Sequence, residues 1–531
     1  MKLSQHDLAQ LDDAYVGSLS DTERHKLCCR LRDDLMEAYD RLNRNSSNSS
    51  CPPSSQPPWF SPSDKAKGET KAKQTDEALE LLKDNSKDKL TDDDHSEPEE
   101  PADSEKSTDK KSDNKGKRKP GKQKGAQGYG RTQQLPVTGT VIHRASLCSG
   151  CSRDFDEDTP FVARFGHYTL DIEKKSEPCV GLQVTYTKHL YGDTECQCGH
   201  ITRTKPYRCP KDSDWNVELT EWHLVGPNLM ALICCLDKRF RMSRRRIKEF
   251  LDEWLGIELA IGTINQCIHE MGRALAPLEA QLIEEASQSG FLHADETSWK
   301  EKGRPAWLWV LSSITLTVYV IGKRDITTLE KILAKTFDGW LMTDGYGAYR
   351  WYKKRLRCWA HLKRKALGLS ESLNKEAKIF GQKALNVLVR LIKAIHRCRE
   401  GPSENLVLKY QKFLDKFRIL CQLFRASKHE KTRELAGEFL NDWEAIFRVL
   451  AHPHLPLTNN EAERTLRHWV ISRRICYGTQ NPQGSRVFAL LPSVIDTCRK
   501  RTVSPWNYLA SVILERRRGN EAPPIPVPVP A

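Results

Sequence analysis

The sequence predicts an α/β fold, in which a layer of strands carries acidic residues and is interrupted by a helical insertion. Residues 289 to 370 hold short apolar and aromatic runs that are typical of strands. Residues 371 to 452 instead repeat apolar residues every three or four positions, as helices do. Two of the strand-like runs, FLHADETSWK and GWLMTDGYGAY, carry Asp295 and Asp344. Residues 453 to 500 contain TNNEAERTLR, which predicts that the layer resumes there and supplies a third acid.

The charge of the chain favours a polyanionic partner. Lys and Arg total 84 against 70 Asp and Glu in 531 residues, which gives a formal net charge of +14 and a pI of about 9.0. Such a balance points most simply to nucleic acid. A merely soluble basic protein is the alternative that the charge alone leaves open.

The sequence also predicts a cytoplasmic protein that does not span a membrane. No uninterrupted apolar run reaches the length of about 20 residues that a membrane helix needs. The N-terminal MKLSQHDLAQ lacks the apolar core of a signal peptide. We therefore expect the 17 cysteines to stay reduced, and most of them to be small core residues.

Residues 1 to 44 are predicted to form an N-terminal helical segment, and residues 45 to 130 a disordered, charged linker. The apolar stripe of the helix fits either a dimerising coiled coil or a helix that packs on its own protein. The stripe consists of Leu27, Leu31, Leu35, Tyr39 and Leu42. The linker begins with NSSNSSCPPSSQPP, is then acidic, and turns basic at KGKRKPGKQKG, where we expect contacts with phosphates.

Residues 136 to 215 are predicted to form a zinc-binding module. Two close cysteine pairs on short turns suit tetrahedral zinc, which takes four soft ligands. The four predicted ligands are Cys148, Cys151, Cys196 and Cys198. The second pair is C-x-C rather than C-x-x-C, so His200 is an alternative ligand, and Cys179 and Cys209 are weaker candidates. Unligated thiols are the other reading of the pattern.

Residues 220 to 288 are predicted to be a helical region resembling a helix-turn-helix. Ser243 is expected to cap a first helix, with Ile247, Phe250, Leu251 and Trp254 on one face, and Gly256 to end it. Thr263 is expected to begin a second helix that enters a major groove, although many such pairs never touch DNA. The basic side chains available for phosphates are Arg241, Arg244, Arg245 and Arg246.

The strands of the predicted layer follow a recognisable order. FLHADETSW is followed by AWLWVLSSI and TLTVYVIGK, an antiparallel pair that turns near residues 312 to 315. A short helix at TTLEKILAK, a strand at GWLMTD and a strand at RLRCWAH come next. Strand, strand, strand, helix, strand, helix, strand is the order of a ribonuclease-H-like α/β layer.

The acids suit two-metal phosphodiester chemistry. Two magnesium ions roughly 3.5–4 Å apart activate a nucleophile and stabilise a leaving oxygen, and hard ions take carboxylate ligands. Asp295 is best placed to bridge the ions, Asp344 completes one of them, and a helix-borne Glu461 or Glu463 completes the other. Each acid also has a purely structural reading: Asp344 precedes Gly345 and suits a turn, and Asn460 with Glu463 makes a capping box.

Several motifs in order resemble the DDE transposases of bacterial insertion sequences of the type numbered sixty-six, over about residues 30 to 515. NSSNSSCPPS and RKPGKQKGAQG look like the segments that precede the family's zinc finger, and the four cysteines fall where its zinc ligands would. HADET and TDGYGAY match the motifs of its first and second catalytic aspartates, and TNNEAERTLR matches its N-N-x-x-E-R motif. CWAHLKRK, at residues 358 to 365, resembles a further family segment, and PWNYL, in the C-terminal segment 501 to 531, resembles another.

The resemblance implies a ribonuclease-H-like catalytic core with a helical insertion before its final glutamate. It implies hydrolysis at the ends of the element and attack of the freed 3′ hydroxyl on target DNA, with Asp295, Asp344 and Glu463 as ligands of Mg²⁺ or Mn²⁺. It further implies double-stranded DNA as partner, a homo-oligomer, small accessory proteins and a bacterial, nucleoid-associated location. The candidates for holding phosphates near the site are His361, Lys363, Arg364, Arg464 and Arg467, for which a solvated basic helix face is the alternative.

Two other functions compete with an active transposase. One is a catalytically inactive DNA-binding protein, a relic or regulator, that uses the zinc and helix-turn-helix modules. The other is a nuclease that cuts without joining. The presence of all three acids argues against a relic, and recovery of joined products would exclude the nuclease.

Overall fold

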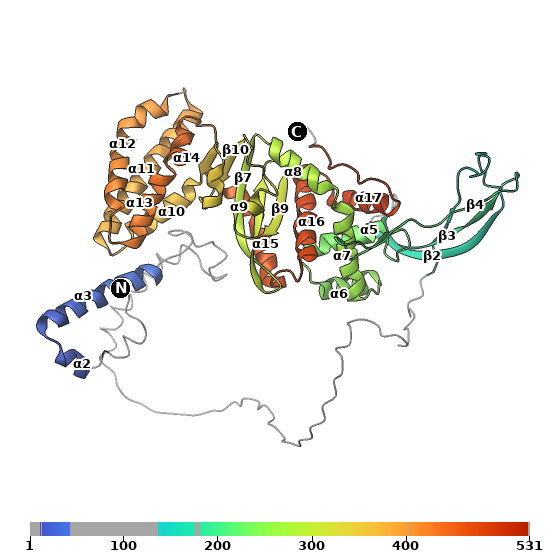
Figure 1. The fold of residues 1–531 in the computed structure, drawn as a ribbon, viewed down its shortest axis with the longest axis horizontal. Coiled ribbons are helices and arrows are strands. Elements are labelled where there is room, and N and C mark those ends of the chain that lie inside the picture. Colours follow the sequence, from blue (N-terminus) through green and yellow to red (C-terminus); the bar gives the residue numbers. More distant parts are fainter. Residues whose placement is uncertain (1–10, 12, 43–135, 176–180, 403, 529–531) are drawn as a thin grey trace, which may run out of the picture. The chain divides into compact units, whose positions relative to one another are not determined.

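The computed structural model describes residue 11 and residues 13–42, 136–175, 181–402 and 404–528 (Figure 1). The predicted linker at 45–130 and Cys179 lie outside the described residues. In the N-terminal part, α2 (Asp13–Ser18) precedes α3 (Asp21–Leu42). The predicted stripe lies on α3, where Leu35 is 72% exposed, and its role as a coiled coil stays a prediction.

The region that follows, within residues 136 to 220, is built of strands. Two long antiparallel strands, β2 (Phe161–Lys174) and β3 (Leu182–Glu195), form its centre, and β1 (Gly139–His143) pairs with β3 in parallel. The short β4 (Ile201–Arg203) pairs in antiparallel direction with the C-terminal end of β3. A separate two-stranded sheet joins β5 (Arg208–Cys209) to β6 (Leu219–Thr220).

Four helices come next: α5 (Pro227–Lys238), α6 (Arg244–Leu255), α7 (Ile261–Leu275) and α8 (Leu278–Gln288). Ser243 caps α6 by accepting a hydrogen bond from the backbone N–H of Arg246, and Gly256 ends it in the left-handed conformation, both as predicted. The prediction that the second helix begins at Thr263 is wrong, because α7 already begins at Ile261. Trp254 does not share the buried face of Ile247 and Leu251, since it is 76% exposed.

The five-stranded central sheet has the order β11-β10-β7-β8-β9. The antiparallel part runs through β7 (Phe291–Glu301), β8 (Arg304–Ser312) and β9 (Thr317–Gly322), as predicted. The parallel part adds β10 (Trp340–Thr343) and β11 (Arg355–Arg357). The helix α9 is shorter than expected (Ile326–Leu329), and the 3₁₀ helix η2 (Gly347–Trp351) joins β10 to β11.

One predicted strand is wrong at its C-terminal end. RLRCWAH was expected to be extended throughout, but β11 ends at Arg357 and α10 (Trp359–Ser370) begins two residues later. Trp359 explains the change, because its ring is buried and its indole N–H donates to the carbonyl of Ile446. The aromatic and apolar residues that suggest a strand are therefore the buried first turn of a helix.

The two faces of the central sheet are covered differently. Alternation along β8 sends Trp309 and Leu311 into a large core shared with α5, α7, α8, α16 (Pro482–Lys500) and α17 (Pro505–Arg517). The opposite face, with Leu308 and Val310, packs against α15 (Asn460–Cys476) and α16. Asp295 has the same parity as Trp299, which lies in that second core, so Asp295 faces the helix that carries Glu463.

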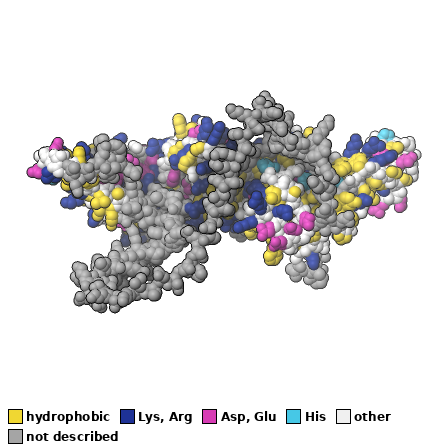
Figure 2. Space-filling model, turned by 90° about the horizontal axis from the view of Figure 1, so that it is seen from below, with side chains coloured by type: hydrophobic (Ala, Val, Ile, Leu, Met, Phe, Trp, Pro, Cys, Tyr) yellow, Lys and Arg dark blue, Asp and Glu magenta, His cyan; other side chains and the backbone are white. Residues whose placement is uncertain are grey.

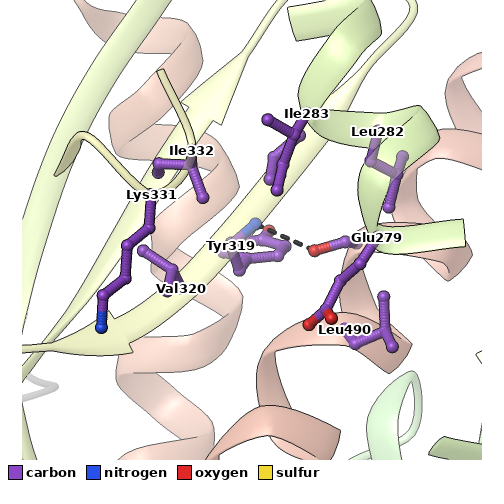
Figure 3. Close-up of a pocket in the computed structure, with 10 residues that line it drawn as sticks. Glu279, Leu282, Ile283, Tyr319, Val320, Lys331, Ile332 and Leu490 are labelled. Carbon is purple, nitrogen blue, oxygen red and sulfur yellow. Dashed lines mark hydrogen bonds between the residues drawn. The ribbon is translucent and has the colours of Figure 1, made fainter. Parts of the chain in front are cut away.

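A small cavity of about 240 Å³ lies between α8, β9 and α16 (Figure 3). Apolar side chains such as Leu282, Ile283 and Leu490 line most of it, and the backbone N–H of Tyr319 donates to the Ser493 hydroxyl there. Its acidic member, Glu279, is paired with Arg486 at 2.5 Å. The cavity lies beside the core rather than beside the three predicted acids.

The region predicted to be a helical insertion, residues 371 to 452, is mostly helical. It consists of α11 (Lys375–Glu400), α12 (Leu406–Phe424), α13 (Glu430–Asn441), α14 (Trp443–Phe447) and the 3₁₀ helix η3 (Arg448–Leu450). Its aliphatic and aromatic side chains form a core together with α10. Among the described residues, no helix is long and apolar enough to cross a membrane.

Buried charges join the insertion to the central sheet. Arg357 on β11 is fully buried and pairs with Asp442 and Glu438 of the insertion. Arg355 donates to the same Asp442 at 2.7 Å. Arg357 also donates to the carbonyl oxygen of Asp344 at 2.9 Å. One guanidinium therefore links the insertion to the segment that carries the second predicted acid.

We predict that Arg357→Met lowers the free energy of unfolding by up to about 3–5 kcal/mol, because the change removes the buried cation that Asp442 and Glu438 share. It leaves only Arg350 and Arg355 to pair with Asp442, and Lys365 to pair with Glu438. Chemical denaturation of the variant and of the wild type measures the difference. Arg425→Met is the matched control, since Arg425 is exposed at the end of α12 and should change stability by less than about 0.5 kcal/mol. Equal loss in both variants would contradict the proposed link.

Candidate active site

The first two predicted acids lie side by side at the centre of the sheet. Asp295 is on β7, and Asp344 directly follows β10, the parallel neighbour of β7. The parallel register of β10 and β7 pairs Met342 with His293. Asp344 and Asp295 each lie two residues further along the chain, so the same register places them side by side. Carboxylate oxygens of Asp295, Asp344 and Glu296 lie within 4.8 Å of one another.

Glu296 is an acid of this group that the sequence reasoning missed. It follows Asp295 on the strand, so its side chain points to the opposite face of the sheet. There it accepts hydrogen bonds from Arg324 at 2.8 Å and from the Tyr349 hydroxyl at 2.7 Å. The sequence does show this acid, as the second acidic residue of HADET. Because neighbouring residues of a strand point to opposite faces of the sheet, the sequence alone places Glu296 on the face away from Asp295.

The backbone after Asp344 is tightly constrained. Gly345 has a φ of +112°, and a Cβ there would lie 2.1 Å from the guanidinium carbon of Arg357. The backbone N–H of Tyr346 donates to the Asp344 carboxylate at 3.1 Å. Gly345 thus lets Arg357 reach the Asp344 carbonyl while the Asp344 side chain turns towards Asp295.

Asn459 positions the helix that carries the third predicted acid. It is fully buried, and its amide donates to the carbonyl of Ala294 at 2.8 Å and contacts the His293 ring at 3.1 Å. Its backbone N–H donates to the sulfur of Cys358 at 3.2 Å. The expected capping box does not form, because α15 has Asn459 rather than Asn460 as its N-cap and its N-cap side chain makes no capping bond. Asn459 instead ties α15 to β7 beside Asp295.

Glu463 lies near the aspartate pair but outside the 4.8 Å group. Its carboxylate is 3.5 Å from Arg364 and 3.6 Å from the Nδ1 of His361, both on α10. The potential ligand atoms of Cys358, His361 and Glu463 lie within 4.8 Å of one another. The motif CWAHLKRK therefore contacts the motif TNNEAERTLR. A site built from both motifs requires such a contact.

Burial sets the protonation of the site. It raises the pKa of Asp295 well above the ordinary value, with Asp344 adding repulsion. Burial likewise raises the pKa of Glu296 to about 7 and raises the pKa of Glu463, which Arg364 partly offsets. Burial, followed by nearby Arg364, lowers the pKa of His361 to about 4, so its imidazole is neutral near neutral pH. Burial thus disfavours the charged form of the Asp295, Glu296 and Glu463 carboxyl groups, and a bound divalent cation would favour that form.

The four predicted zinc ligands come together far from these acids in the sequence. The sulfurs of Cys148, Cys151, Cys196 and Cys198 lie within 4.8 Å of one another. His200 is not part of this group, and its Nε2 is 2.8 Å from the Ser149 hydroxyl. Cys209 lies elsewhere, beside the guanidinium of Arg273. The turn around Gly199, whose φ is +79°, accommodates the close C-x-C pair.

The predicted DNA-binding residues lie on two helices near the acids and on α6. On α15, Arg464 and Arg467 are exposed one turn apart, and Arg464 is 3.7 Å from Glu461. On α10, Lys363 is exposed, whereas His361 and Arg364 lie against Glu463. On α6, Arg245 and Arg246 are exposed and Arg244 pairs with Asp237. Figure 2 shows Lys and Arg side chains gathered in the middle of one face, among acidic and hydrophobic ones.

Comparison with known proteins decides the family. Residues 223–487 match the family model described as "Transposase IS66 family". The chain belongs to this family. The matched region of the IS66-family chain includes Asp295, Asp344 and Glu463, and it excludes the four clustered cysteines.

Three curated relatives come from Sinorhizobium fredii, and each is named as an uncharacterized protein. This IS66-family chain is 25% identical to y4qI over 300 residues, which are 50% of this chain and 54% of the relative. It is 24% identical to y4hP over 331 residues, covering 54% and 59% of the two chains, and 23% identical to y4jO over 169 residues, covering 32% and 50%. The chain thus spans about half the length of the curated relatives it matches.

We predict that Glu296→Gln in this IS66-family protein weakens the pH dependence of the free energy of unfolding, measured in the presence of a metal chelator. The pKa of Glu296 is raised from 4.5 to about 7 in the folded protein. Folding therefore takes up a proton in that window, and the free energy of unfolding falls as pH rises through it. The variant should lose a slope of up to about 1.4 kcal/mol per pH unit. Denaturation across the window measures it.

Glu444→Gln is the control for this measurement, because the Glu444 side chain is 89% exposed. Its slope should equal that of the wild type. An unchanged slope in Glu296→Gln would show that the carboxyl group of Glu296 titrates in the folded protein as it does in the unfolded chain.

Proposed function

We propose that this protein is a DDE transposase that cleaves the ends of an insertion sequence and joins the freed 3′ hydroxyl to target DNA. The observation that carries the proposal is the meeting of Asp295 and Asp344 on adjacent parallel strands, with Glu463 on the helix that Asn459 ties to the same strand. Membership of the IS66 transposase family supports the same reaction class. The strand order β11-β10-β7-β8-β9 supports a ribonuclease-H-like core.

The donor set at the acids fits Mg²⁺ or Mn²⁺. Asp295 and Asp344 offer hard carboxylate oxygens within 4.8 Å of one another, which such ions prefer. When bound, the ions would make the attacking oxygen anionic and stabilise the leaving oxygen of the phosphodiester. We assign Asp295, Asp344 and Glu463 as the ligands.

The protein's own residues hold these ligands in place. Arg357 fixes the backbone of Asp344, and Asn459 fixes the first turn of α15 against β7. Arg364 offsets the charge of Glu463 and, with Lys363, offers a cation to a phosphate near the acids. The exposed Arg464 and Arg467 extend the basic surface from the same turn of α15.

The cysteine group fits a structural zinc ion. Four sulfurs within 4.8 Å of one another form the donor set that zinc takes in closed tetrahedral sites. Two of the sulfur pairs, Cys148–Cys198 and Cys151–Cys196, lie 3.7 and 3.6 Å apart, so they are not disulfides. We propose that zinc holds the end of the β2–β3 module.

Double-stranded DNA is the proposed partner, and two element ends require at least two copies of the chain. The exposed part of the stripe on α3, Leu31, Leu35 and Tyr39, is a candidate contact between copies. Most of α7 is buried, but Ile261, Gly262, Asn265 and Gln266 are exposed near its first turns. The N-terminal residues of a recognition helix are those that reach base edges, so these positions suit a helix-turn-helix role.

We predict that Asp295→Asn, Asp344→Asn and Glu463→Gln each reduce joined product by about a thousandfold or more, because metal stabilisation is worth several kcal/mol. The assay incubates protein, the accessory proteins encoded beside its gene, magnesium and DNA bearing the flanking terminal repeats. Glu461→Gln is the matched control on the same helical turn, since Glu461 pairs with Lys500 at 3.0 Å, and it should retain joining.

Binding of the repeats without any joined product from wild-type protein would favour the inactive DNA-binding protein. Cleaved but unjoined DNA would favour the nuclease. Loss of joining in Glu461→Gln, with joining retained in Glu463→Gln, would identify Glu461 rather than Glu463 as the third metal ligand.

We predict about one zinc ion per chain of purified protein and a clear loss of zinc in Cys151→Ser or Cys198→Ser, since each change removes one of four thiolates. Elemental analysis by mass spectrometry measures the content. Cys209→Ser and His200→Ala serve as controls that should retain zinc, because neither side chain belongs to the sulfur group. Zinc loss in His200→Ala, with zinc retained in Cys151→Ser and Cys198→Ser, would contradict the proposed set of four cysteine ligands.

A further inference from the structure

A cavity of about 470 Å³ lies at the far end of α15 from Glu463. Its walls come from the turn between α5 and α6, from α7, and from the connection between α15 and α16. The polar lining includes Lys238, Arg241, Arg244, His269, Thr479 and Asn481. No predicted acid of the candidate active site lines it.

The charge of the cavity is positive. Three cations line it, and Asp237 is the only acid among the lining residues. Asp237 is paired with Lys238 at 2.8 Å and with Arg244 at 3.0 Å. Arg241 makes no hydrogen bond or ion pair within the described part of the chain. It stands near Arg239 and His468. Burial lowers the pKa values of both groups most, and nearby cations, Arg241 among them, lower these pKa values further. The cavity therefore has an uncompensated guanidinium.

Two helices also begin at this cavity. The N-cap residues Ser243 of the 12-residue α6 and Asn481 of the 19-residue α16 both line it. The backbone N–H groups and dipoles of helix N-termini attract anions. Cations, helix N-termini and a hollow of this size together suit a phosphate group with part of its nucleotide.

Helix α15 connects the cavity with the candidate active site, because Glu463 lies near its start and residues that line the cavity lie near its end. Arg464, Arg467 and Arg474 are exposed on one face of α15, at spacings of three and seven residues. Ser472 and Cys476, near the end of α15, line the cavity. At about 1.5 Å per helical residue they lie roughly 14–20 Å along the helix from Glu463, which corresponds to about four to six nucleotide steps of 3.4 Å.

We propose that this cavity binds a backbone phosphate of the DNA strand that the acids cleave, about four to six nucleotides from the cleaved bond, with Arg241 as its principal contact. The inference rests on the proposed function for the identity of the ligand. The site fixes the register of the strand on α15, because a phosphate held at one end of the helix positions another beside Asp295 and Asp344.

The test measures DNA binding in the full-length Asp295→Asn protein, so that it does not depend on cleavage. Arg241 has a φ of +58°, which glycine adopts without strain, so Arg241→Gly removes the side chain while suiting the backbone. With duplex DNA carrying a terminal repeat, the slope of log affinity against log salt should fall by about one in Arg241→Gly. It should be unchanged in Arg241→Lys, which keeps the charge.

Lys331→Ala is the matched control, because Lys331 is exposed and lines the other cavity (Figure 3). Its slope should equal that of the Asp295→Asn parent. An equal slope and affinity in Arg241→Gly would overturn the proposal, and so would an equal decrease in Lys331→Ala.

A second measurement places the phosphate on the strand. Single neutral methylphosphonate linkages are scanned along the cleaved strand. One linkage, about four to six nucleotides from the cleavage point, should weaken binding to the parent protein but not further weaken binding to Arg241→Gly. If every linkage weakens both proteins equally, the cavity holds no phosphate. If the cavity test succeeds while joining is never observed, the proposed transposase activity fails and the DNA site remains.

Discussion

The structure depends on holding like-charged carboxylates together. Asp295, Glu296 and Asp344 place oxygens within 4.8 Å of one another, with Glu463 close by, and burial raises the pKa values of Asp295, Glu296 and Glu463. Such a group is unfavourable unless protons, cations or metal ions neutralise it. Arg324 at Glu296 and Arg364 at Glu463 supply part of that neutralisation, and the Tyr349 hydroxyl donates a hydrogen bond to Glu296. The remaining negative charge is what divalent cations would bind.

The helical insertion contributes to this arrangement rather than only interrupting it. Glu438 and Asp442 on the insertion pair with Arg357, which in turn holds the carbonyl of Asp344. Lys365 on α10 pairs with the same Glu438 at 2.7 Å, so the helix that carries His361 and Arg364 is fixed to the insertion as well. Glu438 is therefore linked through Arg357 to the carbonyl of Asp344 and through Lys365 to the helix that lies against Glu463.

Much of the fold and of the site follows from local sequence. The alternation in FLHADETSW and AWLWVLSSI and the spacing in the insertion predict strands and helices correctly, and Ser243 and Gly256 mark the ends of α6. Features that depend on distant partners do not follow. Trp359 begins a helix because its ring packs into the insertion, Asn459 rather than Asn460 is the N-cap because its side chain bonds β7, and Glu296 joins the acids across the sheet. Local patterns carry no information on such contacts.

Mn²⁺ binding, followed by electron paramagnetic resonance in the presence of duplex DNA that carries the terminal repeat, tests the metal site at these acids most directly. We expect saturable Mn²⁺ binding by the wild-type protein, displaced by Mg²⁺ and abolished in Asp295→Asn. Asp338→Asn, at an 80% exposed carboxylate, is the control and should bind Mn²⁺ as the wild type does. Equal Mn²⁺ binding by the wild type and Asp295→Asn would contradict the claim that these acids form the metal site.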